Sequence, residues 1–158
     1  MATLITDKDY YNLMKDIDTA TLENTLVKEL TDRNMKISSA ESCTGGMISQ
    51  RITNVSGASN VFELGVCSYA NRIKNKVLGV SNETLNTVGA VSQETATQMC
   101  EGIKELSSSD IGVSTTGIAG PTGGTDKKPV GLVFIGIATK GSTTIYRAEL
   151  CHYTPHSR

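Results

Sequence analysis

Histidine and aromatic side chains are scarce in this chain of 158 residues, which holds 2 histidines, 2 phenylalanines and no tryptophan. Both histidines, His152 and His156, lie close to the end of the sequence. A histidine general base would have to come from that end of the chain. A lysine or a carboxylate therefore deserves more weight as the group that moves a proton.

An excess of one charge and long apolar runs are also missing. The chain carries 15 basic and 16 acidic residues, which argues against a protein that binds nucleic acid through a basic surface. No apolar run is long enough to cross a bilayer, and the first residues lack the apolar segment of a secretory signal. We expect no contact with nucleic acid or with a membrane, whereas a local anion pocket stays compatible with this composition.

Cysteine is sparse, and its spacing is not that of a metal site. Cys43, Cys67, Cys100 and Cys151 form no C-x-x-C pair, so a zinc site of the usual spacing is not expected. The simplest interpretation is a reduced, cytoplasmic protein. Cys67 and Cys100 have apolar neighbours and are expected to pack as small hydrophobic side chains.

The spacing of apolar residues predicts helices and strands that alternate, followed by a hairpin. Helices are expected over residues 22–30, 45–55, 71–78, 81–87 and 92–106. Strands are expected over residues 35–40, 61–70, 111–115, 130–139 and 143–150. This order predicts an α/β fold in which helices cover a mixed β-sheet. The length fits one domain over residues 19–158, preceded by an N-terminal arm over residues 1–18.

Start and stop signals support several of these helices. Thr19 or Thr21 is a reasonable N-cap for the first helix, and Ser92 for the helix over 92–106. Gly57 is expected to close the helix over 45–55. The helix after Ser92 carries one apolar stripe, formed by Ala96, Met99, Cys100, Ile103 and Leu106.

The loop Ala40-Glu-Ser-Cys-Thr-Gly-Gly46 follows the first predicted strand and places two nucleophiles, Ser42 and Cys43, before a glycine pair. The N–H groups at a helix start can bind an anion or stabilise an oxyanion. Serine needs a base, whereas cysteine reacts as a thiolate, and spacing does not choose between them. In the alternative interpretation, Ser42 and Thr44 cap a helix and Cys43 is packed.

Two further loops follow strands, where ligands gather in open α/β sheets. One presents Tyr69 and Lys74, and a lysine can act as a base when desolvation lowers its pKa. A solvated lysine and a packed tyrosine are the alternative. The other loop, Gly117 to Thr125, is rich in glycine, and its amides could bind phosphate. It lacks the Gly-Lys-Ser/Thr ending of a P-loop, and ordinary turns also collect glycine.

Taken together, these loops resemble the CinA C-terminal domain family, also known as the nicotinamide-nucleotide amidases. Order and spacing both fit, from about the first amphipathic helix to the final strand. The matching segments are Ala40-Glu-Ser-Cys-Thr-Gly-Gly46, Ser68-Tyr-Ala-Asn71 with Lys74, Gly89-Ala-Val-Ser92, Gly117-Ile-Ala-Gly-Pro121 with Gly123-Gly124, and Lys128-Pro-Val-Gly131.

The resemblance implies a three-layer α/β/α sandwich that hydrolyses the carboxamide of nicotinamide mononucleotide, giving nicotinate mononucleotide and ammonia in pyridine-nucleotide recycling. It implies no cofactor and no metal, and it suggests a homo-oligomer. The family's catalytic serine, tyrosine and lysine fall on Ser42, Tyr69 and Lys74. The positions that the resemblance assigns to substrate binding are Glu41, Cys43, Thr44, Gly45, Gly46, Asn71, Thr116, Gly117, Gly120, Gly123 and Gly124.

The end of the chain departs from the family pattern. Members usually follow the last strand with a Phe-x-Gly-x-Arg-like segment and a closing helix, whereas here the chain reads Glu149-Leu-Cys-His-Tyr-Thr-Pro-His-Ser-Arg158. The alignment at Arg158 is too poor to give it a phosphate-binding role. Two other functions therefore stay open: a non-catalytic nucleotide-binding or regulatory domain, and a structural subunit for assembly.

Overall fold

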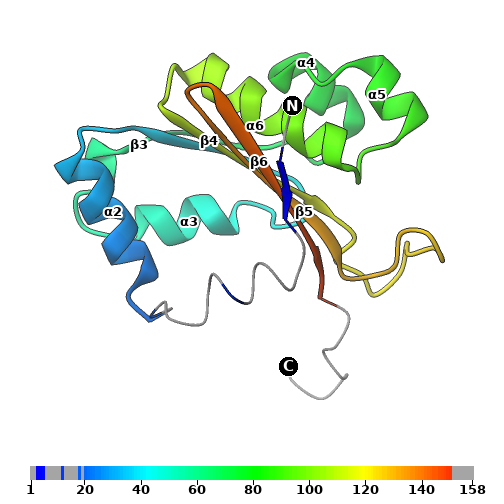
Figure 1. The fold of residues 1–158 in the computed structure, drawn as a ribbon, viewed down its shortest axis with the longest axis horizontal. Coiled ribbons are helices and arrows are strands. Elements are labelled where there is room, and N and C mark those ends of the chain that lie inside the picture. Colours follow the sequence, from blue (N-terminus) through cyan, green and yellow to red (C-terminus); the bar gives the residue numbers. More distant parts are fainter. Residues whose placement is uncertain (1–2, 6–11, 13–17, 19, 151–158) are drawn as a thin grey trace.

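The computed structural model describes residues 3–5, 12, 18 and 20–150 (Figure 1). Its centre is a six-stranded mixed sheet in the order β1-β6-β5-β4-β2-β3. Helices α2 and α3 lie on one side of the sheet and α4, α5 and α6 on the other (Figure 1). This arrangement confirms the predicted α/β/α layering.

The elements follow the predicted order, most of them with shifted bounds. The strands are β1 (Thr3–Ile5), β2 (Ile37–Glu41), β3 (Phe62–Cys67), β4 (Ile111–Gly117), β5 (Leu132–Thr139) and β6 (Ser142–Glu149). The helices are α2 (Leu22–Asp32), α3 (Met47–Thr53), α4 (Asn71–Leu78), α5 (Asn82–Thr87) and α6 (Gln93–Ser107), with a 3₁₀ turn at Ala58–Asn60.

Strand directions bring the three predicted loops to one edge of the sheet. β2 lies between β3 and β4 and runs parallel to both, so the carboxyl ends of all three strands meet. At the end of β2, Glu41 is paired with Cys67 on one side and Thr115 on the other. β5 and β6 complete the sheet as antiparallel neighbours of β4. The loops after β2, β3 and β4 therefore converge at the carboxyl ends of the strands, which is where open α/β sheets bind their ligands.

Helix α6 forms the core of its layer. Ala96, Met99, Cys100 and Ile103 are fully buried, whereas Leu106 is 53% exposed and the prediction for it is wrong. Because an α-helix turns by about 100° per residue, Leu106 lies at the edge of the buried face of α6, and Ser107 lies near the middle of that face. The Ser107 hydroxyl donates to the carbonyl of Ile103 at 2.7 Å.

Glycine lets α6 approach its neighbours at backbone distance. A Cβ at Gly102 would lie 1.9 Å from the carbonyl oxygen of Leu78 on α4. A Cβ at Gly112 of β4 would lie 2.1 Å from the carbonyl oxygen of Cys100. Both distances are too short for a real Cβ atom. Only glycine at these two positions therefore lets α4 and β4 pack this closely against α6.

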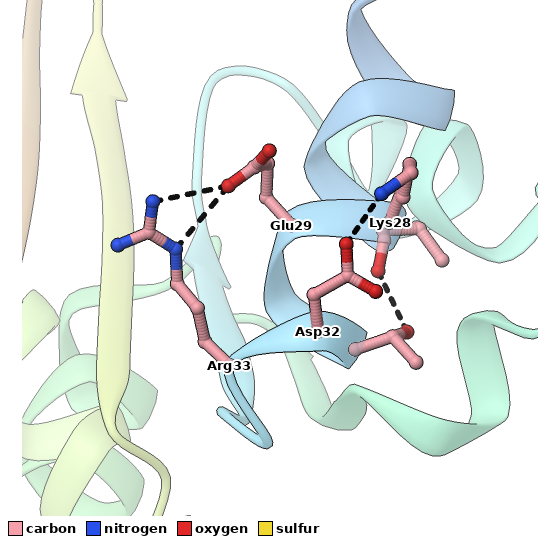
Figure 2. Close-up of polar contacts among 6 residues, drawn as sticks. Lys28, Glu29, Asp32 and Arg33 are labelled. Carbon is pink, nitrogen blue, oxygen red and sulfur yellow. Dashed lines mark hydrogen bonds and ion pairs between the residues drawn. The ribbon is translucent and has the colours of Figure 1, made fainter.

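The opposite layer packs α2 and α3 on the sheet around Val27, Leu30, Ile37 and Ile52. The outer face of α2 carries the ion pairs Lys28–Asp32 and Glu29–Arg33 (Figure 2). All four side chains are more than half exposed, so these pairs add little to stability.

Several local predictions need correction. α3 begins at Met47 rather than Gly45, because Gly45 and Gly46 have positive φ values of 61° and 102°. It ends at Thr53, and Gly57 precedes the 3₁₀ turn instead of closing α3. Thr21 occupies the N-cap of α2 without a side-chain cap bond, whereas Ser92 caps α6 and accepts from the amide of Thr95 at 3.1 Å.

Two further corrections concern the edges of the sheet. Cys67 ends the edge strand β3 and is exposed, so it is not a packed core residue. Residues 3–5, within the expected arm, form β1 and pair in parallel with β6. Within the described part of the chain, no helix is long and apolar enough to cross a membrane.

Candidate active site

The converging loops enclose a cleft of about 420 Å³, a volume within the range of small-molecule sites. Its wall brings together the loops after β2, β3 and β4 and the segment between α5 and α6. The described residues that line it are Ser42, Cys43, Tyr69, Lys74, Ala90, Val91, Thr116, Gly117, Ile118, Ala119, Gly120, Thr122 and Gly123.

Lys74 is the buried amine of this cleft. It lies one turn into α4, and only 1% of its surface is exposed. Its Nζ donates to the carbonyl oxygens of Ser68 at 2.6 Å and Tyr69 at 3.3 Å, and it lies 3.1 Å from Ser42 Oγ. Burial lowers the pKa of Lys74 below 10.5, against a smaller opposing effect of Cys43. The alternative interpretation of Lys74 as a solvated surface lysine is therefore wrong.

Ser42 is held where the Lys74 amine can reach it. Its amide donates to the carbonyl of Thr115 at 3.0 Å and so extends the pairing of β2 with β4 by one residue. The neighbouring thiol differs, because burial raises the pKa of Cys43 above 9.0 and so disfavours the reactive thiolate. Geometry and protonation both favour Ser42 over Cys43 as the nucleophile.

Glu41 lies beneath the cleft rather than in its wall. The side chain is fully buried. Its carboxylate accepts from the amides of Gly46, Ile48 and Ser49 at 2.8–3.1 Å, and from the hydroxyls of Thr44 and Ser49 at 2.6 and 2.7 Å. Burial alone would raise the pKa of Glu41, but these hydrogen bonds outweigh it and hold the pKa below 4.5. This leaves Glu41 no room for the substrate contact that the resemblance implies.

The bonds to Glu41 decide which amides of the loop can meet a ligand. Gly46 donates to Glu41, and Gly45 donates to the carbonyl of Ser42 at 3.2 Å. Among the described residues, the amides of Cys43 and Thr44 donate no backbone hydrogen bond. Neither Ser42 nor Thr44 caps α3, whose N-cap is Gly46. Of the four backbone amides expected over residues 43–46 as oxyanion donors, those of Cys43 and Thr44 therefore remain available.

Tyr69 and Asn71 lie further from the interior of the cleft than the family resemblance implies. Tyr69 borders the cleft, but its side chain is 80% exposed, and the contact with Lys74 is made by its backbone carbonyl. Asn71 is the exposed first residue of α4 and does not line the cleft. In this arrangement, the loop after β3 acts on Lys74 through carbonyl groups.

The glycine-rich loop supplies the opposite wall. Gly117, Gly120 and Gly123 line the cleft, whereas Gly124 packs against Val130, whose amide nitrogen would lie 2.6 Å from a Cβ placed there. Thr116 also lines the cleft, yet its hydroxyl donates to the carbonyl of Ala90 at 2.6 Å. Thr116 thus joins the loop to the segment before α6.

Four backbone amides of this wall donate no backbone hydrogen bond among the residues that the structure describes. They are the amides of Ala119, Gly120, Thr122 and Gly123. Amides presented together in a loop attract anions. The cleft can therefore take a ligand with a carbonyl near Ser42 and an anionic group near this loop.

The apolar residues of the wall are not among the site residues that the sequence predicted. They are Ala90, Val91, Ile118 and Ala119, with the hydroxyl of Thr122 beside them. All four apolar residues lie inside segments that carry the family resemblance, Gly89-Ala-Val-Ser92 and Gly117-Ile-Ala-Gly-Pro121, and that position was the signal that could have identified them. Cys43 and Ile118 also line a larger apolar hollow of about 740 Å³ beside α3, where Thr44 lies.

Some predicted features lie outside this geometry. Within the described ranges, no group of three or more histidine, cysteine, aspartate or glutamate side chains is placed to hold a metal ion. His152, His156, Cys151 and Arg158 lie outside the described residues.

Comparisons with known proteins bear on the family and the fold of this chain. Residues 19–155 match the model of the CinA C-terminal domain. The chain is 59% identical over 124 residues to a relative from Caldicellulosiruptor saccharolyticus that carries the name of a competence-damage inducible protein, covering 78% of this chain and 30% of the relative. It is 50% identical over 129 residues to a CinA-like protein of Kosmotoga olearia, covering 82% of this chain and 31% of that protein. The chain thus spans about a third of the length of these relatives.

Two solved structures share the fold. The competence/damage inducible protein CihA of Agrobacterium tumefaciens superposes with a TM-score of 0.80 at 40% identity, over 81% of this chain and 78% of that one. The competence damage-inducible protein A of Klebsiella pneumoniae gives a TM-score of 0.81 at 31% identity, over 87% and 84% of the two chains.

Proposed function

Because the chain belongs to the CinA C-terminal domain family and its cleft pairs a serine with a buried lysine, we propose that it is an amidohydrolase of nicotinamide mononucleotide. The products are nicotinate mononucleotide and ammonia. One observation carries the proposal: Lys74 Nζ lies 3.1 Å from Ser42 Oγ in a place that disfavours the ammonium form.

The contacts of Lys74 suit a general base. An ammonium group has three N–H donors, whereas a neutral amine has two and one lone pair. The carbonyls of Ser68 and Tyr69 accept two N–H bonds in either state. The remaining direction faces Ser42 Oγ, so the neutral amine presents its lone pair to the serine hydroxyl.

The reaction then follows in balanced steps. Lys74 takes the hydroxyl proton as Ser42 Oγ bonds to the carboxamide carbon. The amides of Cys43 and Thr44 donate to the oxyanion, and one such donor contributes about 10²–10³-fold to the rate. Lys74 returns the proton to the nitrogen as the C–N bond breaks and ammonia leaves. Water then hydrolyses the acyl-enzyme, with Lys74 again as the base.

The nucleotide part of the substrate accounts for the other wall. The amides of Ala119, Gly120, Thr122 and Gly123 are available to the phosphate, while Val91 and Ile118 offer apolar surface to the ring. Binding of the remote phosphate would position the amide over Ser42. Nothing in these steps calls on a metal or an organic cofactor.

The proposal also covers setting and assembly. A pyridine mononucleotide is a cytoplasmic substrate class, and the described thiols Cys43, Cys67 and Cys100 are free. We propose a homo-oligomer, which light scattering after size exclusion would detect as a mass above 16.8 kDa.

The test is incubation of the purified chain with nicotinamide mononucleotide, with ammonia and nicotinate mononucleotide both quantified. We expect equimolar products from the wild type and from Cys43→Ala, and none from Ser42→Ala. Activity lost in Cys43→Ala and kept in Ser42→Ala would move the nucleophile to the thiol. A folded wild type that raises its melting temperature with the nucleotide but releases no ammonia would instead be a binding domain.

A further inference from the structure

The carboxylate beneath the nucleophile loop has no part in the reaction steps above, yet it is the most heavily bonded side chain of the region. Glu41 is fully buried. No cationic side chain among the described residues pairs with its carboxylate. A buried charge without a counter-ion is costly. The five hydrogen bonds that the carboxylate accepts offset this cost, and they also hold the loop that donates them.

All five donors belong to the segment that follows Ser42. One carboxylate oxygen accepts from the Thr44 hydroxyl at 2.6 Å and from the amides of Gly46 and Ile48 at 3.1 and 3.0 Å. The other accepts from the amide and hydroxyl of Ser49 at 2.8 and 2.7 Å. The chain from Ser42 to Ser49 is therefore folded around a single charged group.

Glu41 is also linked toward both neighbouring strands, on one side through the Thr44 hydroxyl and on the other through its own backbone carbonyl. The Thr44 hydroxyl lies 2.7 Å from the hydroxyl of Thr115 on β4. The backbone carbonyl of Glu41 accepts from the amide of Ser68, whose own carbonyl accepts from Lys74. One residue thus connects the loop that carries the nucleophile to the strand end that holds the base.

We propose that Glu41 is a positioning residue, whose carboxylate fixes Ser42 against Lys74 and aims the amides of Cys43 and Thr44 at the reacting carbonyl. The Glu41 carboxylate accepts from the amides of Gly46, Ile48 and Ser49, whereas the amides of Cys43 and Thr44 donate no backbone hydrogen bond among the described residues. A misplacement of about 1 Å at such a site costs on the order of 10²-fold in rate. The kinetic part of this role rests on the proposed function.

The test compares Glu41→Gln with the wild type in two assays. Glutamine keeps the shape but turns an NH₂ group toward N–H donors. We expect kcat for nicotinamide mononucleotide to fall about 100-fold with KM within about twofold. We also expect sulfonylation of Ser42 by phenylmethylsulfonyl fluoride, followed by mass spectrometry, to slow by a similar factor.

Asp110→Asn is the matched control. The Asp110 carboxylate accepts from the amide of Lys36 at 2.7 Å at the opposite edge of the sheet, so this variant should keep wild-type rates. If Glu41→Gln does not fold, Thr44→Val removes one donor from the carboxylate and should lower both rates about tenfold. Hydrogen exchange at Gly46, Ile48 and Ser49 should accelerate in either folded variant.

The outcomes separate this role from the proposed function. A folded Glu41→Gln with wild-type kcat and labelling, or with a raised KM and unchanged kcat, overturns the positioning role. A wild type that is sulfonylated at Ser42 but leaves the nucleotide intact refutes the substrate alone, and the labelling rates still decide the role of Glu41. A wild type that shows neither reaction overturns both.

Discussion

Two buried regions beside this sheet are held together by different interactions, apolar packing in one and hydrogen bonds in the other. Along α6, the contact is apolar and so tight that Gly102 and Gly112 face carbonyl oxygens directly. At the carboxyl end of β2, the buried side chains Glu41 and Lys74 are ionisable, and hydrogen bonds replace apolar contact. The first region tolerates no added atom, whereas the second tolerates no lost polar partner.

The difference separates stability from activity. Apolar packing along α6 holds the layers together and needs no particular chemistry. The polar region buries two ionisable side chains that a stable protein could do without, and these side chains fix one defined arrangement of serine, lysine and amides. Changes along α6 should alter unfolding, and changes around Lys74 should alter turnover.

The largest effect should come from replacing the base. Lys74→Met should lower kcat/KM for nicotinamide mononucleotide by about 10²–10⁴-fold, the usual contribution of a general base. Lys76→Met, at an exposed position of the same helix, should keep wild-type activity. Steady-state ammonia release measures both. Equal activity in the two variants would remove the lysine from the mechanism.

The α6 contact gives the next largest effect, on stability. Helix propensity alone predicts that Gly102→Ala stabilises the protein. A Cβ at 1.9 Å from the Leu78 carbonyl predicts instead a loss of about 1–3 kcal/mol in the free energy of unfolding. Urea denaturation of Gly102→Ala beside Glu105→Ala, an exposed position on α6, decides between them, because only the glycine variant should lose stability.

Stability should also change with pH in a way that belongs to Lys74. Burial lowers the folded-state pKa of this amine below 10.5. Between the folded and unfolded pKa values the unfolded chain binds more protons, so the free energy of unfolding rises with pH through that window. Because burial raises the pKa of the Cys43 and Cys100 thiols and so lowers stability as pH rises in both proteins, the Lys74 contribution is the difference in melting temperature between the wild type and Lys74→Met. This difference should rise with pH through the window, and a difference that falls would place the folded pKa of Lys74 above 10.5.

Thr116 gives a smaller effect that distinguishes a structural from a ligand-binding hydroxyl. Its bond to the Ala90 carbonyl predicts that Thr116→Val costs about 1 kcal/mol of stability. Thr116→Ser should retain both stability and KM. A large rise in KM for Thr116→Val at unchanged melting temperature would show that the hydroxyl contacts the substrate.

The smallest effect lies outside both regions. Glu29→Gln breaks the exposed pair with Arg33 on α2 (Figure 2) and should cost about 0.3–0.5 kcal/mol. Chemical denaturation at low and high salt measures it, and the cost should shrink with salt. A cost of several kcal/mol would mean that the pair is coupled to the core.

Periodicity and spacing predicted much of the fold. The stripe on α6 repeats with helical period, and α4 has the predicted bounds, Asn71–Leu78. β1 escaped prediction because three residues carry no period, and Cys67 was misplaced because apolar neighbours do not reveal an edge strand. At the cleft, motif order named Ser42 and Lys74, but burial and direction are tertiary properties. Sequence therefore could not show that Glu41 points inward or that Tyr69 acts on Lys74 through its carbonyl.

The protonation state of Lys74 is the most direct test. A protein labelled with ¹³C at the lysine ε-carbons gives one resonance per lysine, and Lys74→Met identifies the resonance of Lys74. We predict that this resonance titrates below the ordinary lysine pKa of 10.5, because burial favours the neutral amine that the proposed general base requires. A resonance that titrates at or above 10.5 would show a stable ammonium group and contradict the proposed general base.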